Sequence, residues 1–160
     1  MKRIFSPWRK TYIENAEKEE GCIFCNALRH DANGEKTLIV FRGERAFVIV
    51  NLYPYTSGHV MVAPIDHKSS LELLDPATRS EMMELVTRAI EALKRAYDPQ
   101  AFNVGANIGK AAGAGVPDHI HMHIVPRWNG DTNFMSTLGE TRVLPETIDE
   151  TLKRLKENWK

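Results

Sequence analysis

Three histidines alternate with large apolar residues in the run His119-Ile-His121-Met-His123-Ile-Val. Alternation with a period of two is typical of a half-buried strand, so this spacing predicts a strand over residues 119–125 with the three imidazoles on one face. At a rise of about 3.3 Å per residue, the outer two histidines would lie about 13 Å apart. Because one metal ion cannot bind all three, we expect the strand to serve two adjacent sites, or one metal ion and one reactive imidazole.

The pair Cys22 and Cys25 contains the only cysteines of the chain. A lone Cys-x-x-Cys pair is compatible with a redox couple, with half of a zinc site or with two ordinary residues. A zinc site needs two further ligands, and His67 and His119 would complete a Cys₂His₂ set. Zinc in that position would be structural and would tie the N-terminal segment to the sheet.

If His119 binds zinc, His121 is available for chemistry on phosphorus. Neutral imidazole, with an ordinary pKa of about 6.5, is a competent nucleophile near pH 7 without the base that serine requires. His59 and His123 could then hold the phosphoryl oxygens or the leaving group, and backbone N–H groups of residues 113–115 could bind an anion. A zinc hydrolase in which neighbouring histidines share a metal, and a set of purely structural histidines, remain alternatives at this point.

The flanking sequence predicts the elements that position these residues. Asp75 and Pro76 indicate a helix start, with aspartate as the cap and proline at the first helical position, and helical spacing of apolar residues continues to residue 97. Pro145 is expected to open a second helix, and turn residues predict a loop over residues 29–36. Strands rich in apolar residues are predicted over residues 37–41, 46–51, 60–63 and 101–108.

This order of elements predicts an α+β domain with a mainly antiparallel sheet of about five strands and two main helices. The glycines of residues 109–115 lie between two predicted strands, so they lack the strand-loop-helix context of a dinucleotide-binding fingerprint. We expect one domain over residues 1–160. It would comprise an N-terminal segment (1–36), a core (37–136) and a C-terminal helix (137–160).

The charge balance of the chain gives no reason to expect a nucleic-acid or membrane partner. Its 160 residues include 21 Lys and Arg and 21 Asp and Glu, which gives a formal net charge of zero. Nothing in this balance predicts binding to nucleic acid or to a membrane. The first residues lack the apolar run of a signal peptide, and no segment has the length of a membrane span, so a cytoplasmic protein is expected.

These motifs together resemble a known family. The alternating histidines resemble the His-φ-His-φ-His-φ-φ signature of the histidine triad (HIT) superfamily of nucleotide hydrolases and transferases. Residues 58–67, which begin Gly-His and end in His67, look like the second conserved stretch of that family, and Cys22-x-x-Cys25 looks like its zinc half-site. Residues 51–55, 103–107 and 126–134 resemble more narrowly the bacterial diadenosine tetraphosphate phosphorylase-like branch. The resemblance runs from Trp8 to the last helix.

The resemblance implies a HIT-like fold that forms a homodimer, pairing two sheets into one. It implies a nucleotidyl hydrolase or transferase that cleaves adenine dinucleotides, such as diadenosine tetraphosphate, at the α-phosphate, with phosphate or water as the acceptor. One structural zinc ion per chain and no organic cofactor are expected. The implied roles are nucleophile for His121, phosphate contacts for His123 and His59, ribose contact for Asn51, phosphate or leaving-group contact for Asn107, and zinc ligands for Cys22, Cys25, His67 and His119.

The chain departs from the family pattern in the loop before the triad. Other branches often carry Gln-Ser or Gln-Thr where this chain has Ala114-Gly115. Side-chain phosphate contacts are therefore lost, and Gly113, Ala114 and Gly115 are predicted to bind substrate through backbone N–H groups alone. Two other functions remain as alternatives: a zinc-dependent hydrolase whose metal is catalytic, and a non-catalytic protein that binds or senses nucleotides.

Overall fold

A computed structural model describes residues 20–131 and 144–160 of the chain. The predicted features at residues 1–19 and 132–143, including Trp8 and the end of the 126–134 stretch, lie outside the described residues. The elements, in chain order, are α2 (Ile23–Ala32), β1 (Ile39–Arg42), β2 (Ala46–Val50), β3 (Val60–Pro64), η1 (Leu71–Leu73), α3 (Pro76–Tyr97), β4 (Ala101–Gly105), η2 (Lys110–Ala112), β5 (Met122–Arg127) and α5 (Ile148–Asn158).

The five strands form one sheet in the order β1-β2-β3-β5-β4, and every neighbouring pair is antiparallel. β5 lies between β3 and β4, with His123 opposite Met61 on one side and Gly105 on the other. The predicted α+β fold with a five-stranded antiparallel sheet is therefore confirmed. Because β5 lies between two strands, His123 lies in a part of the sheet that is paired on both sides.

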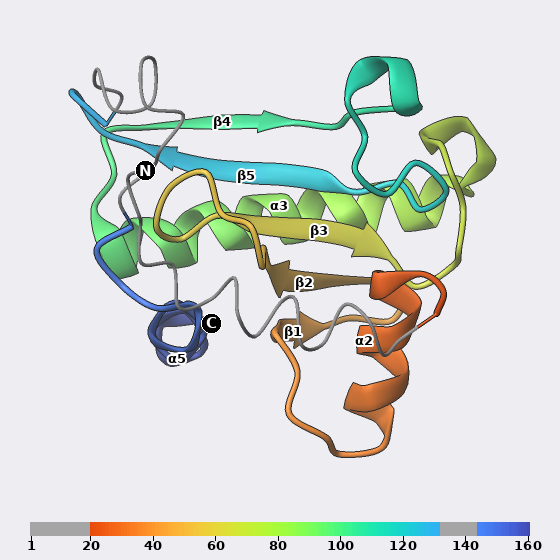
Figure 1. The fold of residues 1–160 in the computed structure, drawn as a ribbon, viewed down its shortest axis with the longest axis horizontal. Coiled ribbons are helices and arrows are strands. Elements are labelled where there is room, and N and C mark those ends of the chain that lie inside the picture. Colours follow the sequence, from red (N-terminus) through yellow and green to blue (C-terminus); the bar gives the residue numbers. More distant parts are fainter. Residues whose placement is uncertain (1–19, 132–143) are drawn as a thin grey trace, which may run out of the picture.

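Helix α3 covers one face of the sheet, behind the strands in Figure 1. The Asp75 side chain accepts a hydrogen bond from the Thr78 N–H at 3.0 Å, and proline follows the cap, as predicted from the sequence. The apolar stripe of α3 packs on inward side chains of β2 and β3, which makes the larger of two core clusters. A smaller cluster on the opposite face joins α2 to the sheet through Phe24, Leu28, Ile39, Phe47, Ile49, Met61 and Ala63.

The predicted strand over residues 119–125 begins too early. β5 starts at Met122, so only His123 of the triad lies in a strand. The backbone N–H of Ile120 donates to the carbonyl of Lys68 at 2.6 Å, which ties this segment to the loop after β3 instead of to the sheet ladder. An extended segment outside a sheet also alternates its side chains, so the sequence pattern does not distinguish such a segment from a paired strand.

Both smaller helices differ from the prediction. Residues 29–32 belong to α2, whose buried residues Phe24 and Leu28 are four apart and give only a narrow apolar stripe. Helix α5 begins at Ile148 instead of Pro145, because Thr147 and Glu150 form a capping box in which each side chain bonds the backbone of the other.

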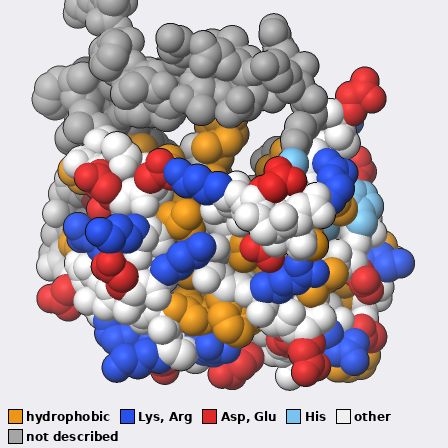
Figure 2. Space-filling model, turned by 90° about the horizontal axis from the view of Figure 1, so that it is seen from below, with side chains coloured by type: hydrophobic (Ala, Val, Ile, Leu, Met, Phe, Trp, Pro, Cys, Tyr) orange, Lys and Arg blue, Asp and Glu red, His pale blue; other side chains and the backbone are white. Residues whose placement is uncertain are grey.

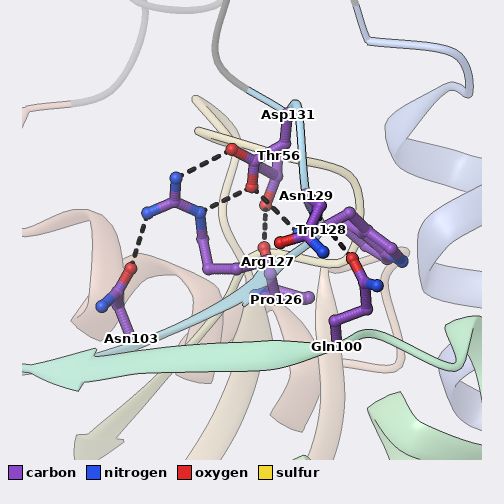
Figure 3. Close-up of polar contacts among 8 residues, drawn as sticks. All are labelled: Thr56, Gln100, Asn103, Pro126, Arg127, Trp128, Asn129 and Asp131. Atoms are coloured by element: carbon purple, nitrogen blue, oxygen red, sulfur yellow. Dashed lines mark hydrogen bonds and ion pairs between the residues drawn. The ribbon is translucent and has the colours of Figure 1, made fainter.

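The far end of β5 is held by a polar network (Figure 3). The guanidinium of Arg127 donates to both carboxylate oxygens of Asp131, at 2.6 and 2.8 Å, and to the Asn103 side-chain oxygen at 2.7 Å. Asp131 also accepts from the Trp128 N–H at 3.1 Å. The chain leaving β5 is thereby fixed against β4.

The surface carries both signs of charge. Figure 2 shows acidic and basic side chains interspersed on one face, with hydrophobic side chains between them. This mixture agrees with the formal net charge of zero. Among the helices of residues 20–131 and 144–160, none combines the length and hydrophobicity that crossing a membrane requires.

Candidate functional site

Four residues predicted as zinc ligands lie together. One ligand atom from each of Cys22, Cys25, His67 and His119 lies within 4.8 Å of the other three. The His119 Nδ1 atom is 3.3 Å from the Cys22 Sγ and 3.7 Å from the Cys25 Sγ, and the His67 Nδ1 atom is 3.4 Å from the Cys25 Sγ. These residues come from the start of α2, the loop after β3 and the segment before β5, so the cluster joins three distant parts of the chain.

The geometry of this cluster fits zinc. Bond lengths of about 2.3 Å to sulfur and 2.0 Å to nitrogen place tetrahedral ligand atoms roughly 3.5 Å apart, close to the separations observed. His119 donates its Nε2–H to the Pro64 carbonyl at 2.9 Å, which leaves the Nδ1 lone pair directed at the thiols. Both cysteines are free thiols, and burial, followed by the neighbouring Cys22, raises the pKa of Cys25. A bound cation would stabilise the thiolate forms of these two cysteines.

His121 lies beside this cluster and is only 4 % exposed. Its Nδ1 is 2.9 Å from the His119 carbonyl, which can only accept, so Nδ1 carries the proton. The neutral ring then keeps the lone pair on Nε2. Burial lowers the pKa of His121, although the bond to His119 opposes this effect. The ring is therefore held in the form that a nucleophile or base requires.

His59 and His123 are joined by a hydrogen bond between their rings. The backbone N–H of Tyr55 donates to the His59 Nδ1 at 3.1 Å, so the proton of neutral His59 lies on Nε2. That Nε2–H donates to the His123 Nδ1 at 2.9 Å, which leaves the His123 proton on Nε2. Burial, and then the positive charge that His121 would carry, lowers the pKa of His123. His123 can thus donate a hydrogen bond through its Nε2–H, whereas His121 presents a lone pair.

The loop between β2 and β3 positions His59. Gly58 has a φ of +80°, and an added Cβ would lie 2.9 Å from the Leu93 side chain, so only glycine fits before His59. Asn51, predicted to contact ribose, is 7 % exposed, and its Oδ1 accepts from the Tyr53 N–H at 2.8 Å. Its Nδ2 is 3.3 Å from the His59 ring. Asn51 therefore shapes the turn that carries His59, and a ribose contact stays a prediction.

The glycine-rich loop before the triad is a tight turn around η2. The Gly113 N–H donates to the Lys110 carbonyl at 3.0 Å, and the Ala114 N–H is 3.4 Å from the Gly109 carbonyl. Two of the backbone groups predicted to bind an anion are thus engaged within the turn. The substrate contacts of Gly113, Ala114, Gly115 and Asn107 stay predictions.

Two aromatic residues of the site were not predicted from the sequence. The Tyr55 ring is stacked on His123, with centroids 6.0 Å apart and an interplanar angle of 19°. The Phe24 ring, 1 % exposed, contacts the rings of His119 and His121. Both residues are close in sequence to predicted site residues: Phe24 lies between the two cysteines, and Tyr55 lies a few residues before His59. That proximity is the one signal that could have identified them.

An α+β fold with buried, neutral imidazoles beside a Cys₂His₂ cluster defines a protein of the histidine triad class. The sequence matches the HIT domain family over residues 33–130, and the chain belongs to this family, as its motifs suggested.

The chain is similar to several named proteins and solved structures. The AP-4-A phosphorylase of Mycobacterium tuberculosis is 34% identical over 168 residues, covering 99% of this chain and 85% of that protein. A Zn-bound histidine triad family protein from Mycobacterium smegmatis matches with a TM-score of 0.69 and 29% identity, covering 86% of this chain and 92% of that one. A hypothetical histidine triad nucleotide-binding protein from Sulfolobus tokodaii matches with a TM-score of 0.69 and 26% identity, covering 86% of this chain and 91% of that one.

Proposed function

We propose that this protein is a nucleotidyl hydrolase or transferase that cleaves adenine dinucleotides such as diadenosine tetraphosphate at the α-phosphate. The carrying observation is the pair of opposite tautomers: His121 presents an Nε2 lone pair, and His123 presents an Nε2–H. The similarity to AP-4-A phosphorylase over 99% of the chain supports this substrate class.

In the first step, the His121 Nε2 atom attacks the α-phosphorus and forms a P–N bond. The bond from phosphorus to the bridging oxygen breaks, and the leaving nucleotide departs with its electron pair. The His123 Nε2–H donates a hydrogen bond to the phosphate oxygens or the leaving oxygen and keeps its proton, and the His123 Nδ1 stays hydrogen-bonded to His59. Neutral imidazoles suit both tasks because burial lowers the pKa of His121 and of His123.

In the second step, an oxygen of phosphate or water attacks the same phosphorus. The P–N bond breaks and returns the electron pair to His121, and an attacking water loses its proton to solvent. From diadenosine tetraphosphate, the first step releases ATP, and the second releases ADP with phosphate as the acceptor or AMP with water. Asn51, Asn107 and residues 113–115 are the proposed contacts to ribose and phosphate.

Zinc belongs to the structural part of this proposal. Cys22, Cys25, His67 and His119 would hold one ion per chain, and the ion would fasten α2 to the segment before β5. Four protein ligands close a tetrahedral site, so the cluster offers no open position for water. This closure favours structural zinc over the rival function, a hydrolase with a catalytic metal. A homodimer is part of the proposal, as the family resemblance implies.

The test is product analysis. The protein is incubated with diadenosine tetraphosphate, with and without phosphate, and the nucleotides are separated. ATP with ADP only when phosphate is present identifies a phosphorylase, and ATP with AMP identifies a hydrolase. Calorimetry with AMP and ATP runs in parallel. Binding without turnover of any dinucleotide would overturn the enzymatic proposal in favour of a nucleotide-sensing protein.

A further inference from the structure

Phe24 connects the Cys₂His₂ cluster to His121. It lies between Cys22 and Cys25 in the sequence, in the first turn of α2. Its ring centroid is 5.0 Å from that of His119 and 4.9 Å from that of His121, with interplanar angles of 48° and 42°. One buried ring thus packs on a residue of the cluster and on the proposed nucleophile.

The orientation of His121 depends on such packing. Its hydrogen bond to the His119 carbonyl fixes one ring atom, Nδ1. The plane of the ring, and hence the direction of the Nε2 lone pair, also depends on the rings in contact with it. These belong to Phe24 and to His123, whose centroid is 4.9 Å away. A reactive group must be held within about 0.5 Å and 10–20° of its productive geometry, so the loss of one contact matters.

The position of Phe24 in turn depends on the cluster. Cys22 precedes α2 and has no side-chain capping bond to the helix; its Sγ instead faces His119. The Cys25 Sγ faces both His67 and His119. When the two thiols share an ion with these histidines, the backbone on both sides of Phe24 is fixed relative to the segment that carries His121.

We infer that Phe24 is a positioning residue that couples zinc occupancy of the cluster to the orientation of the His121 imidazole. Zinc loading then sets the rate of the chemical step in addition to the stability of the fold. This inference rests on the proposed function, in which His121 is the nucleophile.

The test compares Phe24→Leu with Phe47→Leu in the zinc-loaded protein. Phe47 is a matched control because it is 0 % exposed, belongs to the same core cluster and meets Phe24 edge-on at 6.3 Å. Both variants remove a buried ring from this apolar core cluster, but only Phe24→Leu removes the ring packed on His121. The measurements are zinc content, the denaturation midpoint, kcat, KM and the imidazole ¹⁵N and ring-proton NMR signals of His121.

We expect Phe24→Leu to keep its zinc, to lose at least about tenfold in kcat with KM within about twofold, and to shift the His121 signals. Phe47→Leu should lower the midpoint comparably and keep kcat within about twofold. Removing zinc from the wild type with a chelator should shift the His121 signals, and the same treatment should shift them less in Phe24→Leu.

Wild-type His121 signals in zinc-loaded Phe24→Leu, or equal losses of kcat in both variants, would overturn the inference. If Phe24→Leu does not fold, Phe24→Met, which fills much of the same space without a ring, takes its place. If the wild type turns over no dinucleotide, the proposed function fails, while the NMR signals still decide whether Phe24 orients His121.

Discussion

The two ends of β5 carry polar groups of different kinds. At the start of the strand, His119 and His121 lie before the ladder begins, are buried, and use one ring nitrogen each to donate to a carbonyl. At its end, Arg127 and Asp131 form a charged pair that also engages Asn103 (Figure 3). At the start of β5, the neutral histidine rings keep a lone pair available. At its end, the guanidinium of Arg127 donates hydrogen bonds to Asp131 and Asn103.

This difference separates function from support along a single strand. A buried polar atom whose capacity is not used within the protein costs stability, so it persists where a ligand or a reaction uses it. A charged pair with several hydrogen bonds is the arrangement expected where the chain must only be held in place. Substitutions at the start of β5 should therefore affect chemistry and metal binding, and substitutions at its end should affect folding alone.

The largest effect is expected for His121→Gln. Glutamine can still donate to the His119 carbonyl but lacks an imidazole nucleophile, so dinucleotide turnover should fall by about 10³-fold or more. The free energy of unfolding should change far less. His30→Gln is the matched control, because His30 pairs with Glu35 on the surface, away from the triad. Full activity of His121→Gln would remove the functional distinction between the ends of β5.

The next largest effect is expected for Cys25→Ser, which removes a ligand that faces both His67 and His119. Zinc content by elemental analysis should fall from about one equivalent per chain toward zero. A metal ion present at about a hundred times its Kd stabilises the folded state by about 3 kcal/mol. The free energy of unfolding should therefore drop by about 3 kcal/mol or more in Cys25→Ser. A wild type that is free of zinc and normally stable would contradict this prediction.

The two ends of β5 also differ in how far the sequence revealed them. The His-x-His-x-His spacing and the Cys-x-x-Cys pair are local patterns with a chemical meaning. They selected Cys22, Cys25 and His119, and His67 was added to complete a Cys₂His₂ set; the fold brings these four residues together. The sheet and α3 followed equally from periodicity and from the cap at Asp75. Signals of this kind can be recognised in a single sequence because each pattern spans only a short stretch of the chain.

Other features depend on contacts between distant residues. The bond from Ile120 to Lys68 decides where β5 begins, and no periodicity indicates it. The Arg127 network reaches Asn103 on β4, and the packing of Phe24 on His121 joins residues almost a hundred positions apart. The tautomers of His59 and His123 depend on a donor from the Tyr55 backbone, which only the folded loop provides.

A smaller effect is expected for Asp131→Ala at the end of β5. Its carboxylate is 12% exposed and accepts from Arg127 and from the Trp128 N–H, so its loss should lower the free energy of unfolding by about 2 kcal/mol. Zinc content and the His121 NMR signals should stay as in the wild type. Glu157→Ala is the control, because the exposed Lys153–Glu157 pair should contribute less than about 0.5 kcal/mol. Loss of zinc in Asp131→Ala would show that the two ends are coupled.

The smallest effect is expected in the pH dependence of stability. Burial, and then the charge that His121 would carry, lowers the pKa of His123 below its ordinary value of 6.5, whereas in the unfolded chain His123 titrates near that value. As the pH falls through 6.5, the unfolded chain takes up a proton that the folded chain does not, so stability is lost on acidification. One histidine contributes at most about 1.4 kcal/mol per pH unit to this slope. His123→Gln should therefore reduce the decrease in unfolding free energy between about pH 7.5 and 5.5, measured by urea denaturation. An unchanged slope would mean that His123 has the same pKa in the folded and unfolded chains, so that its contacts with His59 and Tyr55 do not disfavour the charged ring, and the contrast with the charged end of β5 would be lost.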